Sequence, residues 1–329
     1  MIATKSALSL TALWTLLILP HPAPASAQNI KSYVSNSGSN ANACDSVAHA
    51  CATFQTALTK TIAGGEIAVV DTGDYGEVLI GQQVSISNDG AGEASMFVGD
   101  TPLTGAGIII GAGVGDVVSL RGLVIDGRGI GNIGILVGQA SAVHVQNCVI
   151  RNLEGAGGTG LLFQPSNNSQ LFVSDSIIFN NGSGAGTGGI VIQPTGSGGA
   201  NVALDRVHLE NNVLGLYVDG SQSAGNGGHV VVRDSVVSGN AAGGILAFTL
   251  TRFAPAFLVV EHTSSVNNGG TGILANGPHA TMLLDGTLVA RNGVGISAVN
   301  GGQLISYGNN KVNNNLGVDG IPTGSYSPL

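Results

Sequence analysis

Short runs of alternating apolar and polar positions recur through most of the chain. Two successive copies within residues 171–218 read LFVSDSIIFNNGSGAGTGGIVI and NVALDRVHLENNVLGLYV. Alternation with a period of two is typical of strands, and the Gly- and Asn-rich segments between them are typical of turns. We therefore predict three short strands per copy. The alignment pairs Leu171 with Val202, Val173 with Leu204, Asp175 with Asp205, Ile177 with Val207, Phe179 with Leu209 and Asn181 with Asn211.

Two markers repeat at nearly constant spacing. A Gly followed by Ile or Leu returns at Gly134, Gly160, Gly189, Gly215, Gly244, Gly272 and Gly295. A polar residue after the first triplet returns with a similar interval, at Asn147, Asp175, Asp205, Asp234 and His262. Such self-similarity indicates a solenoid. The segments between strands are too short for the helix that a leucine-rich repeat needs, so we predict an all-β, single-stranded parallel β-helix of about nine coils.

The alternation also predicts which side chains point outward. In the third strand of each coil the outward positions are apolar, which predicts a continuous stripe through Leu136, Leu162, Val191, Tyr217, Leu246 and Leu274. In the second strand the residues predicted to face outward are Ile150, Ile178, Val237 and Val289. An exposed apolar stripe marks an interaction surface, unless the long turns at residues 182–188 and 220–228 fold over it.

Asparagine recurs at the turns. The positions are Asn181, Asn211, Asn240, Asn268 and Asn292. Because Asn tolerates the left-handed conformation and bonds to backbone, we predict that these residues adopt it and link stacked turns.

The N-terminal segment, residues 1–27, has the features of a secretory signal. Lys5 precedes an apolar stretch from Ala7 to Leu19, and Ala25-Ser26-Ala27 matches a cleavage site. The stretch is short for a membrane anchor, which is the alternative. We expect cleavage near Ala27, a secreted or cell-surface protein, and no transmembrane segment in the mature chain.

The remaining chain divides into three parts. Residues 28–51 form an extended lead-in, residues 52–315 form the β-helix with a cap helix at 52–62, and residues 316–329 form a tail that covers or trails from the last coil. Thr53 can cap that helix and Gly64 can end it. In an exported protein Cys44 and Cys51 favour a disulfide. A metal site with His49 is the alternative, but it lacks a fourth ligand. Cys148 is expected to be a buried small hydrophobe.

Composition restricts the class of partner. The net charge is −8 with only 11 Lys and Arg, and charged residues make up 9% of the chain. Binding to a phosphate backbone needs clustered cations, so nucleic acid is excluded as a partner. Low charge also argues against disorder.

The repeats resemble those of right-handed parallel β-helix proteins of the pectin-lyase-like superfamily, in particular secreted bacterial members. The opening GGEIAVVDTGDYGEVLIGQQVSIS is similar to the first coil of such proteins, and the preceding helix resembles their N-terminal cap. The resemblance covers residues 52–315. It implies the fold, and it implies polysaccharide lyase, glycoside hydrolase or carbohydrate esterase activity only as a range of options.

One column of aspartates is the best candidate for catalysis. Asp175, Asp205 and Asp234 align in three successive coils, with Arg206 beside them. Neighbouring members would lie about 5 Å apart, a spacing that suits a carboxylate pair or, in a lyase, Ca²⁺. The alternative is that Asp and Asn simply accept backbone hydrogen bonds at turns. Asn147 and His262 in the same column favour that alternative.

Four further residues are candidates for glycan binding: His208, Glu210, Tyr217 and Asp219. The superfamily's hydrolase motifs, a paired Asp, Gly-His-Gly and Arg-x-Lys, are absent from the sequence. We therefore expect a secreted or cell-surface scaffold or adhesion-type protein that binds glycan or itself and needs no cofactor. The alternative is an enzyme that acts on acidic polysaccharide through the aspartate column.

Overall fold

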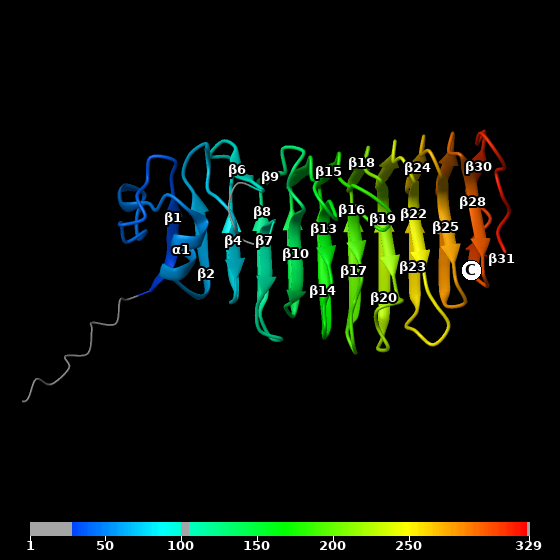
Figure 1. The fold of residues 1–329 in the computed structure, drawn as a ribbon, viewed down its shortest axis with the longest axis horizontal. Helices are drawn as coiled ribbons and strands as arrows, with labels where there is room; N and C mark the ends of the chain where they lie inside the picture. Colours follow the sequence, from blue (N-terminus) through cyan, green and yellow to red (C-terminus); the bar gives the residue numbers. More distant parts are fainter. Residues whose placement is uncertain (1–27, 100–104, 328–329) are drawn as a thin grey trace, which may run out of the picture.

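Three parallel sheets wind around one core in a rod (Figure 1). The computed structural model describes residues 28–99 and 105–327. The predicted signal peptide, residues 1–27, lies outside the described residues. Within these described residues, sheet C has nine strands, one for each coil. The predicted parallel β-helix of about nine coils with one short N-terminal helix is confirmed.

The strands of each sheet follow one another at one coil per strand. Sheet A contains β1 (Asn29–Val34), β2 (Thr61–Val69), β5 (Val84–Ser87), β8 (Val117–Arg121), β11 (Ala142–Gln146), β14 (Asn168–Ser174), β17 (Gly199–Asp205), β20 (Gly227–Arg233), β23 (Ala256–Glu261), β26 (Ala280–Asp285), β29 (Gln303–Ser306) and β31 (Gly324–Ser325). Sheet B contains β3 (Gly73–Asp74), β6 (Ala94–Phe97), β9 (Leu123–Asp126), β12 (Val149–Arg151), β15 (Ile177–Phe179), β18 (His208–Glu210), β21 (Val236–Ser238), β24 (Ser264–Val266), β27 (Leu288–Ala290) and β30 (Lys311–Asn313). Sheet C contains β4 (Val78–Ile80), β7 (Ala106–Gly111), β10 (Ile133–Gln139), β13 (Thr159–Phe163), β16 (Gly188–Ile192), β19 (Leu214–Asp219), β22 (Gly243–Phe248), β25 (Thr271–Asn276) and β28 (Val294–Val299).

Register stacks equivalent side chains into columns. In sheet A one buried column runs through Val143, Leu171, Val202, Val230, Leu258, Met282 and Leu304. Each member packs on its counterparts about 4.8 Å away. The predicted pairing of Leu171 with Val202 and of Val173 with Leu204 is therefore correct. The sequence does not predict strand β6, because residues 88–102 lack an alternating pattern.

The predicted orientation of the sheet B strands is wrong. Ile150, Ile178, Val237 and Val289, which the alternation places on the outside, are all fully buried. The turn from sheet A to sheet B contains two residues, one in the left-handed conformation and one that points inward. The inward residues are Cys148, Ser176, Val207, Ser235, Thr263 and Thr287. This additional inward position shifts the phase of each following strand by one residue.

A buried asparagine ladder connects the turns from sheet B to sheet C. Its members are Asn181, Asn212, Asn240, Asn268, Asn292 and Asn315. From Asn212 onward, the Oδ1 of each accepts hydrogen bonds from the backbone N–H and the Nδ2 of the Asn one coil before, as Asn240 does from Asn212 at 2.9 and 3.2 Å. The prediction of left-handed Asn at 181, 240, 268 and 292 is wrong. The residue before each is left-handed, as at Asn211, which is not a ladder member.

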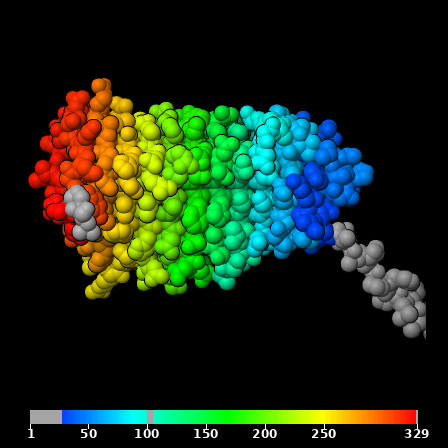
Figure 2. Space-filling view, turned by 180° about the vertical axis from the view of Figure 1, so that it is seen from behind, coloured from blue at the N-terminus to red at the C-terminus, as the bar shows by residue number. Residues whose placement is uncertain are grey.

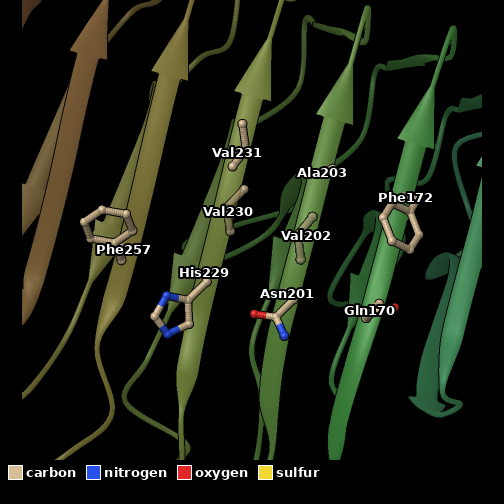
Figure 3. Close-up of a pocket in the computed structure, with 9 residues that line it drawn as sticks. All are labelled: Gln170, Phe172, Asn201, Val202, Ala203, His229, Val230, Val231 and Phe257. Carbon is tan, nitrogen blue, oxygen red and sulfur yellow. The ribbon is translucent and has the colours of Figure 1, made fainter. Parts of the chain in front are cut away.

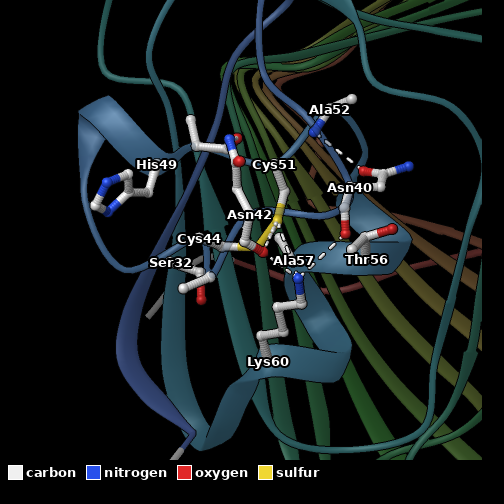
Figure 4. The surroundings of a disulfide bond; sticks show 12 residues. Ser32, Asn40, Asn42, Cys44, His49, Cys51, Ala52, Thr56, Ala57 and Lys60 are labelled. Atoms are coloured by element: carbon white, nitrogen blue, oxygen red, sulfur yellow. Dashed lines mark hydrogen bonds between the residues drawn. A yellow bond between two sulfur atoms is a disulfide. The ribbon is translucent and has the colours of Figure 1, made fainter.

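Helix α1 (Phe54–Lys60) and a disulfide close the N-terminal end. Thr53 caps α1 by accepting a hydrogen bond from Thr56 N–H at 3.2 Å, and Phe54 is buried beneath it. The helix ends at Lys60, before the predicted Gly64. Cys44 and Cys51 form a disulfide (Figure 4). Within residues 28–99 and 105–327, no helix has the length and apolar character needed to cross a membrane.

The disulfide loop covers the free edge of β1. The N–H of Cys51 donates to the Tyr33 carbonyl at 2.9 Å, and the N–H of Tyr33 donates to the Cys44 carbonyl at 2.8 Å. An edge protected in this way cannot pair with another chain. The lead-in therefore supplies the first strand of sheet A as well as its cover.

The tail folds back on the last coil. Strand β31 pairs with β29, and the N–H groups of Gly295 and Ile296 in β28 donate to the carbonyls of Val318 and Asp319 at 2.8 and 2.9 Å. Asp319 also ends the asparagine ladder, because its Oδ1 accepts from Asn315 N–H and Nδ2 at 3.0 and 2.8 Å. The space-filling view shows the continuous rod that results (Figure 2).

The predicted apolar stripe on sheet C is largely covered. Leu136, Leu162, Leu246 and Leu274 point outward but are half-buried, and Val191 is only 3% exposed. The turn at residues 182–188 crosses the stripe, where a Cβ on Gly186 would lie 3.7 Å from the Tyr217 ring. This turn therefore covers the middle of the stripe. Self-association through the stripe stays a prediction.

We expect Asn212→Ala to destabilise the fold by about 2–4 kcal/mol, because it leaves the buried Asn181 donors and the Ile178 carbonyl without their partner. Urea-induced unfolding followed by circular dichroism measures the change. Asn211→Gly is the control, since Asn211 is exposed and left-handed and Gly keeps that backbone. Equal stability losses in the two variants would contradict a stabilising ladder.

Candidate functional site

A network of charged side chains lies at the corner between sheets A and B. Arg206 donates from Nε and Nη2 to the two carboxylate oxygens of Asp175 at 2.7 and 3.1 Å, and from Nη1 to Asp205 at 2.5 Å. Arg233 donates from Nε to Asp205 at 3.2 Å and lies 3.8 Å from Asp234. Five charged groups of three coils are thus joined by ion pairs.

The predicted equivalence of the aspartates is wrong by one residue. Asp205 is in register with Ser174 and Arg233, at the ends of β14 and β20. The counterparts of Asp175 are Arg206 and Asp234, which share its left-handed φ of about 50°. The column of Asp175 therefore alternates in sign along the rod, and neighbouring members attract one another.

The arrangement suits ion pairing better than catalysis or metal binding. The Arg206 guanidinium holds the pKa of Asp175 below its usual range, so this carboxyl group is ionised and paired at neutral pH. Among residues 28–99 and 105–327, no three His, Cys, Asp or Glu side chains come together as a metal site. The carboxylate oxygens that would bind Ca²⁺ face arginines instead.

The four predicted glycan-binding residues lie elsewhere. His208 and Glu210 are on the outer face of sheet B, where their side chains contact each other at 2.9 Å. Tyr217 and Asp219 are on sheet C. Burial, followed by the charge of Asp219, raises the pKa of Tyr217. Asp219 is 4% exposed and accepts hydrogen bonds from Gln193 Nε2 and Ser221 N–H, both at 2.8 Å. Among the described residues, none of these four side chains forms a hydrogen bond or ion pair with Asp175, Asp205 or Asp234.

A trough of about 310 Å³ lies on the outer face of sheet A (Figure 3). It is lined by Gln170, Phe172, Asn201, Val202, Ala203, His229, Val230, Val231 and Phe257. Phe172, Ala203 and Val231 are in register on neighbouring strands. Because Ala203 has the smallest side chain of the three, the face is hollow there and higher on both sides.

Two aromatic pairs flank the hollow. Phe172 is 37% exposed and stacks on His144 with 4.8 Å between ring centroids and 11° between planes. Phe257 lies 6.1 Å from His229 at the other end. The exposed side-chain amides of Gln170, on the same strand as Phe172, and of Asn201, on the next strand, line the trough (Figure 3), and neither side chain has a hydrogen-bond partner in the part of the chain that the structure describes. An apolar floor with a few unpaired polar groups is typical of a ligand site.

The charged corner lies beyond the trough on the same strands, and none of its residues is part of the trough lining. Asp205 and Arg233 follow Ala203 and Val231 by two residues, so they point from the same face of the same strands. The trough was missed at the sequence level. The sequence did contain an indication of it, because only 4% of the residues are aromatic and two of them occupy outward positions of the first strand, Phe172 and Phe257.

We expect Arg206→Met to raise the pKa of Asp175 toward its ordinary value, as measured by NMR titration. Because the folded-state pKa is depressed, the ion pair stabilises the fold above the unfolded-state pKa, and this contribution is lost as the pH falls through the folded-state pKa. The Tm difference between wild type and variant should therefore be small at neutral pH and vanish in acid. Arg291→Met is the control, since Arg291 is also left-handed and bonds the uncharged Asn267.

A different outcome would restore a catalytic interpretation of this corner. That outcome is an Arg206→Met protein with an unchanged Asp175 pKa and Tm that has lost an activity on polysaccharide.

Comparisons with known proteins identify the fold. A pectate lyase structure, Pel9A, aligns with a TM-score of 0.61 at 14% identity over 85% of this chain and 75% of its own. An alginate lyase structure from Paenibacillus sp. str. FPU-7 aligns with a TM-score of 0.51 at 14% identity over 91% of this chain and 97% of its own. At such identity the likeness shows the fold alone. No curated protein matches by sequence.

The family match covers more than half of the chain. Residues 134–316 match the family described as "Right handed beta helix region". This range includes the charged corner, the trough and the whole asparagine ladder. The chain belongs to the right-handed β-helix family.

Proposed function

We propose that this protein is an exported scaffold or adhesion-type protein that binds an uncharged polysaccharide along the outer face of sheet A. The trough between Phe172 and Phe257 is the observation that carries the proposal. Aromatic rings can pack against the apolar C–H face of a sugar, and the unpaired amides of Gln170 and Asn201 can bond its hydroxyl groups.

The geometry suits a polymer. The trough crosses four strands, from β14 to β23, and its lining repeats at the strand spacing of about 4.8 Å. A chain that lies along the rod axis would meet Phe172 and the Gln170 amide at one end, the Asn201 amide next and Phe257 at the other end. Export through the predicted signal sequence, with cleavage near Ala27, belongs to this proposal.

Charge favours a neutral ligand. Asp205 and Glu261 lie on the same face as the trough, and Asp175 and Asp234 lie at the adjacent corner. The two arginines of the corner are already paired with carboxylates. A uronic-acid polymer would approach these carboxylates without a free cation to bind it, which is unfavourable.

The alternative is an enzyme of the polysaccharide lyase or glycoside hydrolase type. The two solved structures named above are lyases, but only their fold is shared. Its test is degradation of polygalacturonate and alginate, followed through reducing ends and unsaturated products. Product formation that Asp205→Ala abolishes, with the fold unchanged by circular dichroism, would replace the binding proposal with this one.

We expect Phe172→Ala to weaken binding of a neutral polysaccharide roughly fivefold, because one exposed aromatic ring contributes on the order of 1 kcal/mol to such contacts. Affinity electrophoresis in gels containing glucan, xylan or mannan, followed by calorimetry with the best oligosaccharide, measures the effect. Binding should change little with ionic strength.

Ile177→Ala is the matched control. Ile177 is 42% exposed against 37% for Phe172, but it lies on sheet B, outside the trough. The proposal fails if none of the neutral polymers retards the protein, or if both variants lose affinity equally.

A further inference from the structure

A second pocket lies where the strands of sheet C end and the chain turns toward sheet A. It has a volume of about 270 Å³ and is lined by Phe248, Thr249, Leu250, Thr251, Asn276, Gly277, Pro278 and Asn300. Phe248 and Asn276 are in register at the ends of β22 and β25, and Asn300 follows β28. The turn after β22, residues 249–255, forms one wall and extends from the rod (Figure 1, yellow).

Hydrogen bonds between coils fix the floor of this pocket. Thr249 N–H donates to the Asn276 carbonyl at 2.9 Å, and Gly277 N–H donates to the Val299 carbonyl at 3.1 Å. Thr249 Oγ1 accepts from His279 N–H at 3.0 Å. Gly277 has a φ of 116°, and a Cβ there would lie 2.0 Å from the Thr249 carbonyl oxygen. Only glycine fits, so the pocket is preformed by the backbone.

The polar side of the pocket offers a donor and an acceptor next to each other. Asn300 Nδ2 donates to Asn276 Oδ1 at 2.8 Å. This bond leaves Asn276 Nδ2 and Asn300 Oδ1 without a partner among the described residues. The apolar part of the lining consists of Phe248, Pro278 and Leu250, of which Leu250 is 45% exposed.

The lining defines the ligand. None of the lining side chains is ionisable at neutral pH, so charge gives no reason to bind an ion. The ligand must accept from one amide, donate to the next and present an apolar face to the ring. The volume of this pocket, about 270 Å³, lies just below the roughly 300–1,000 Å³ that is usual for ligand pockets. The pocket therefore holds about one six-membered ring.

We propose that this pocket binds a single neutral pyranose unit. Adjacent hydroxyl groups of a pyranose can accept from Asn276 and donate to Asn300, while its C–H face packs on Phe248 and Leu250. The class of ligand rests on the proposed function. The position of the site rests on this pocket alone.

The second site would add to binding of a polymer. Residues 249–255, which form one wall of the pocket, lead into β23, whose Phe257 ends the trough. A branch of a bound polysaccharide, or a second chain, could occupy the pocket at the same time. Two linked weak sites bind more tightly than either alone.

A ¹⁵N-NMR titration with methyl glucoside, galactoside, mannoside and xyloside tests the site directly. The amides of Thr251, Gly277 and Asn300 report on the pocket, whereas those of Ala203 and Val231 report on the trough. We expect at least one pyranoside to shift the pocket amides in a saturable way. We also expect Asn300→Gly to weaken this binding about three- to tenfold, the effect of one hydrogen bond.

The Asn300→Gly substitution preserves the backbone conformation. Asn300 is left-handed with a φ of 52°, which Gly adopts freely. Asn314→Gly is the matched control, because Asn314 is exposed with a φ of 57° and lies outside the pocket. Leu250→Ala should weaken the same titration from the apolar side.

The outcomes separate the two proposals. If trough amides respond to oligosaccharide while pocket amides stay silent to every pyranoside, the second site is refuted and the proposed function stands. If pocket amides respond and the trough amides do not, the proposed function is refuted and the second site stands. Pocket binding that Asn300→Gly leaves unchanged would also overturn the assignment.

Discussion

Stacking of equivalent positions in parallel strands is the constraint on which this structure depends. Each side chain of one coil lies about 4.8 Å from its counterparts in the coils before and after it. Apolar residues satisfy this arrangement by packing, and asparagines satisfy it because each amide both donates and accepts. A charge cannot stack on a like charge without cost. In the Asp175, Arg206 and Asp234 column the charges alternate in sign, and Arg206 forms an ion pair with Asp175.

The asparagine ladder needs a hydrogen-bond acceptor at its C-terminal end. Every bond between ladder asparagines points from one coil to the next, so the last member, Asn315, has donors but no following asparagine. Asp319 supplies the acceptor from the tail, and hydrogen bonds from Asn315 N–H and then its side chain lower the Asp319 pKa. A charged acceptor gives a stronger bond than a neutral amide. The tail therefore closes the rod although Leu316 and Ile321 remain more than four-fifths exposed.

The sequence was sufficient for the period, the three strands of each repeated coil and the sheet A core, because its alternation is unambiguous there. It was insufficient for the turn between sheets A and B. Ile177, Ile178 and Phe179 are all apolar, so either phase gives an acceptable strand, and only the inward Ser176 decides between them. The same ambiguity explains why the predicted alignment paired Asp205 with Asp175, one residue away from its true register. Arg206 rarely favours the left-handed conformation on its own, yet here it takes that conformation and places Asp205 on the strand. The trough was predictable in part: register puts Phe172 outward, but the hollow depends on the size of Ala203.

Uniform columns make a stable rod but a featureless surface, since every coil presents the same groups. Recognition along the rod therefore requires positions where a column changes. In the trough the column changes from Phe172 to Ala203 to Val231, and the alanine leaves the volume of the proposed site. At the second pocket the change is polar: Phe248 stands in register with Asn276, and the chain then turns before Asn300. Both places combine a ring with amides whose hydrogen bonds are incomplete. A solenoid can thus gain a binding site by altering a single residue of a column, while the neighbouring coils keep the backbone in place.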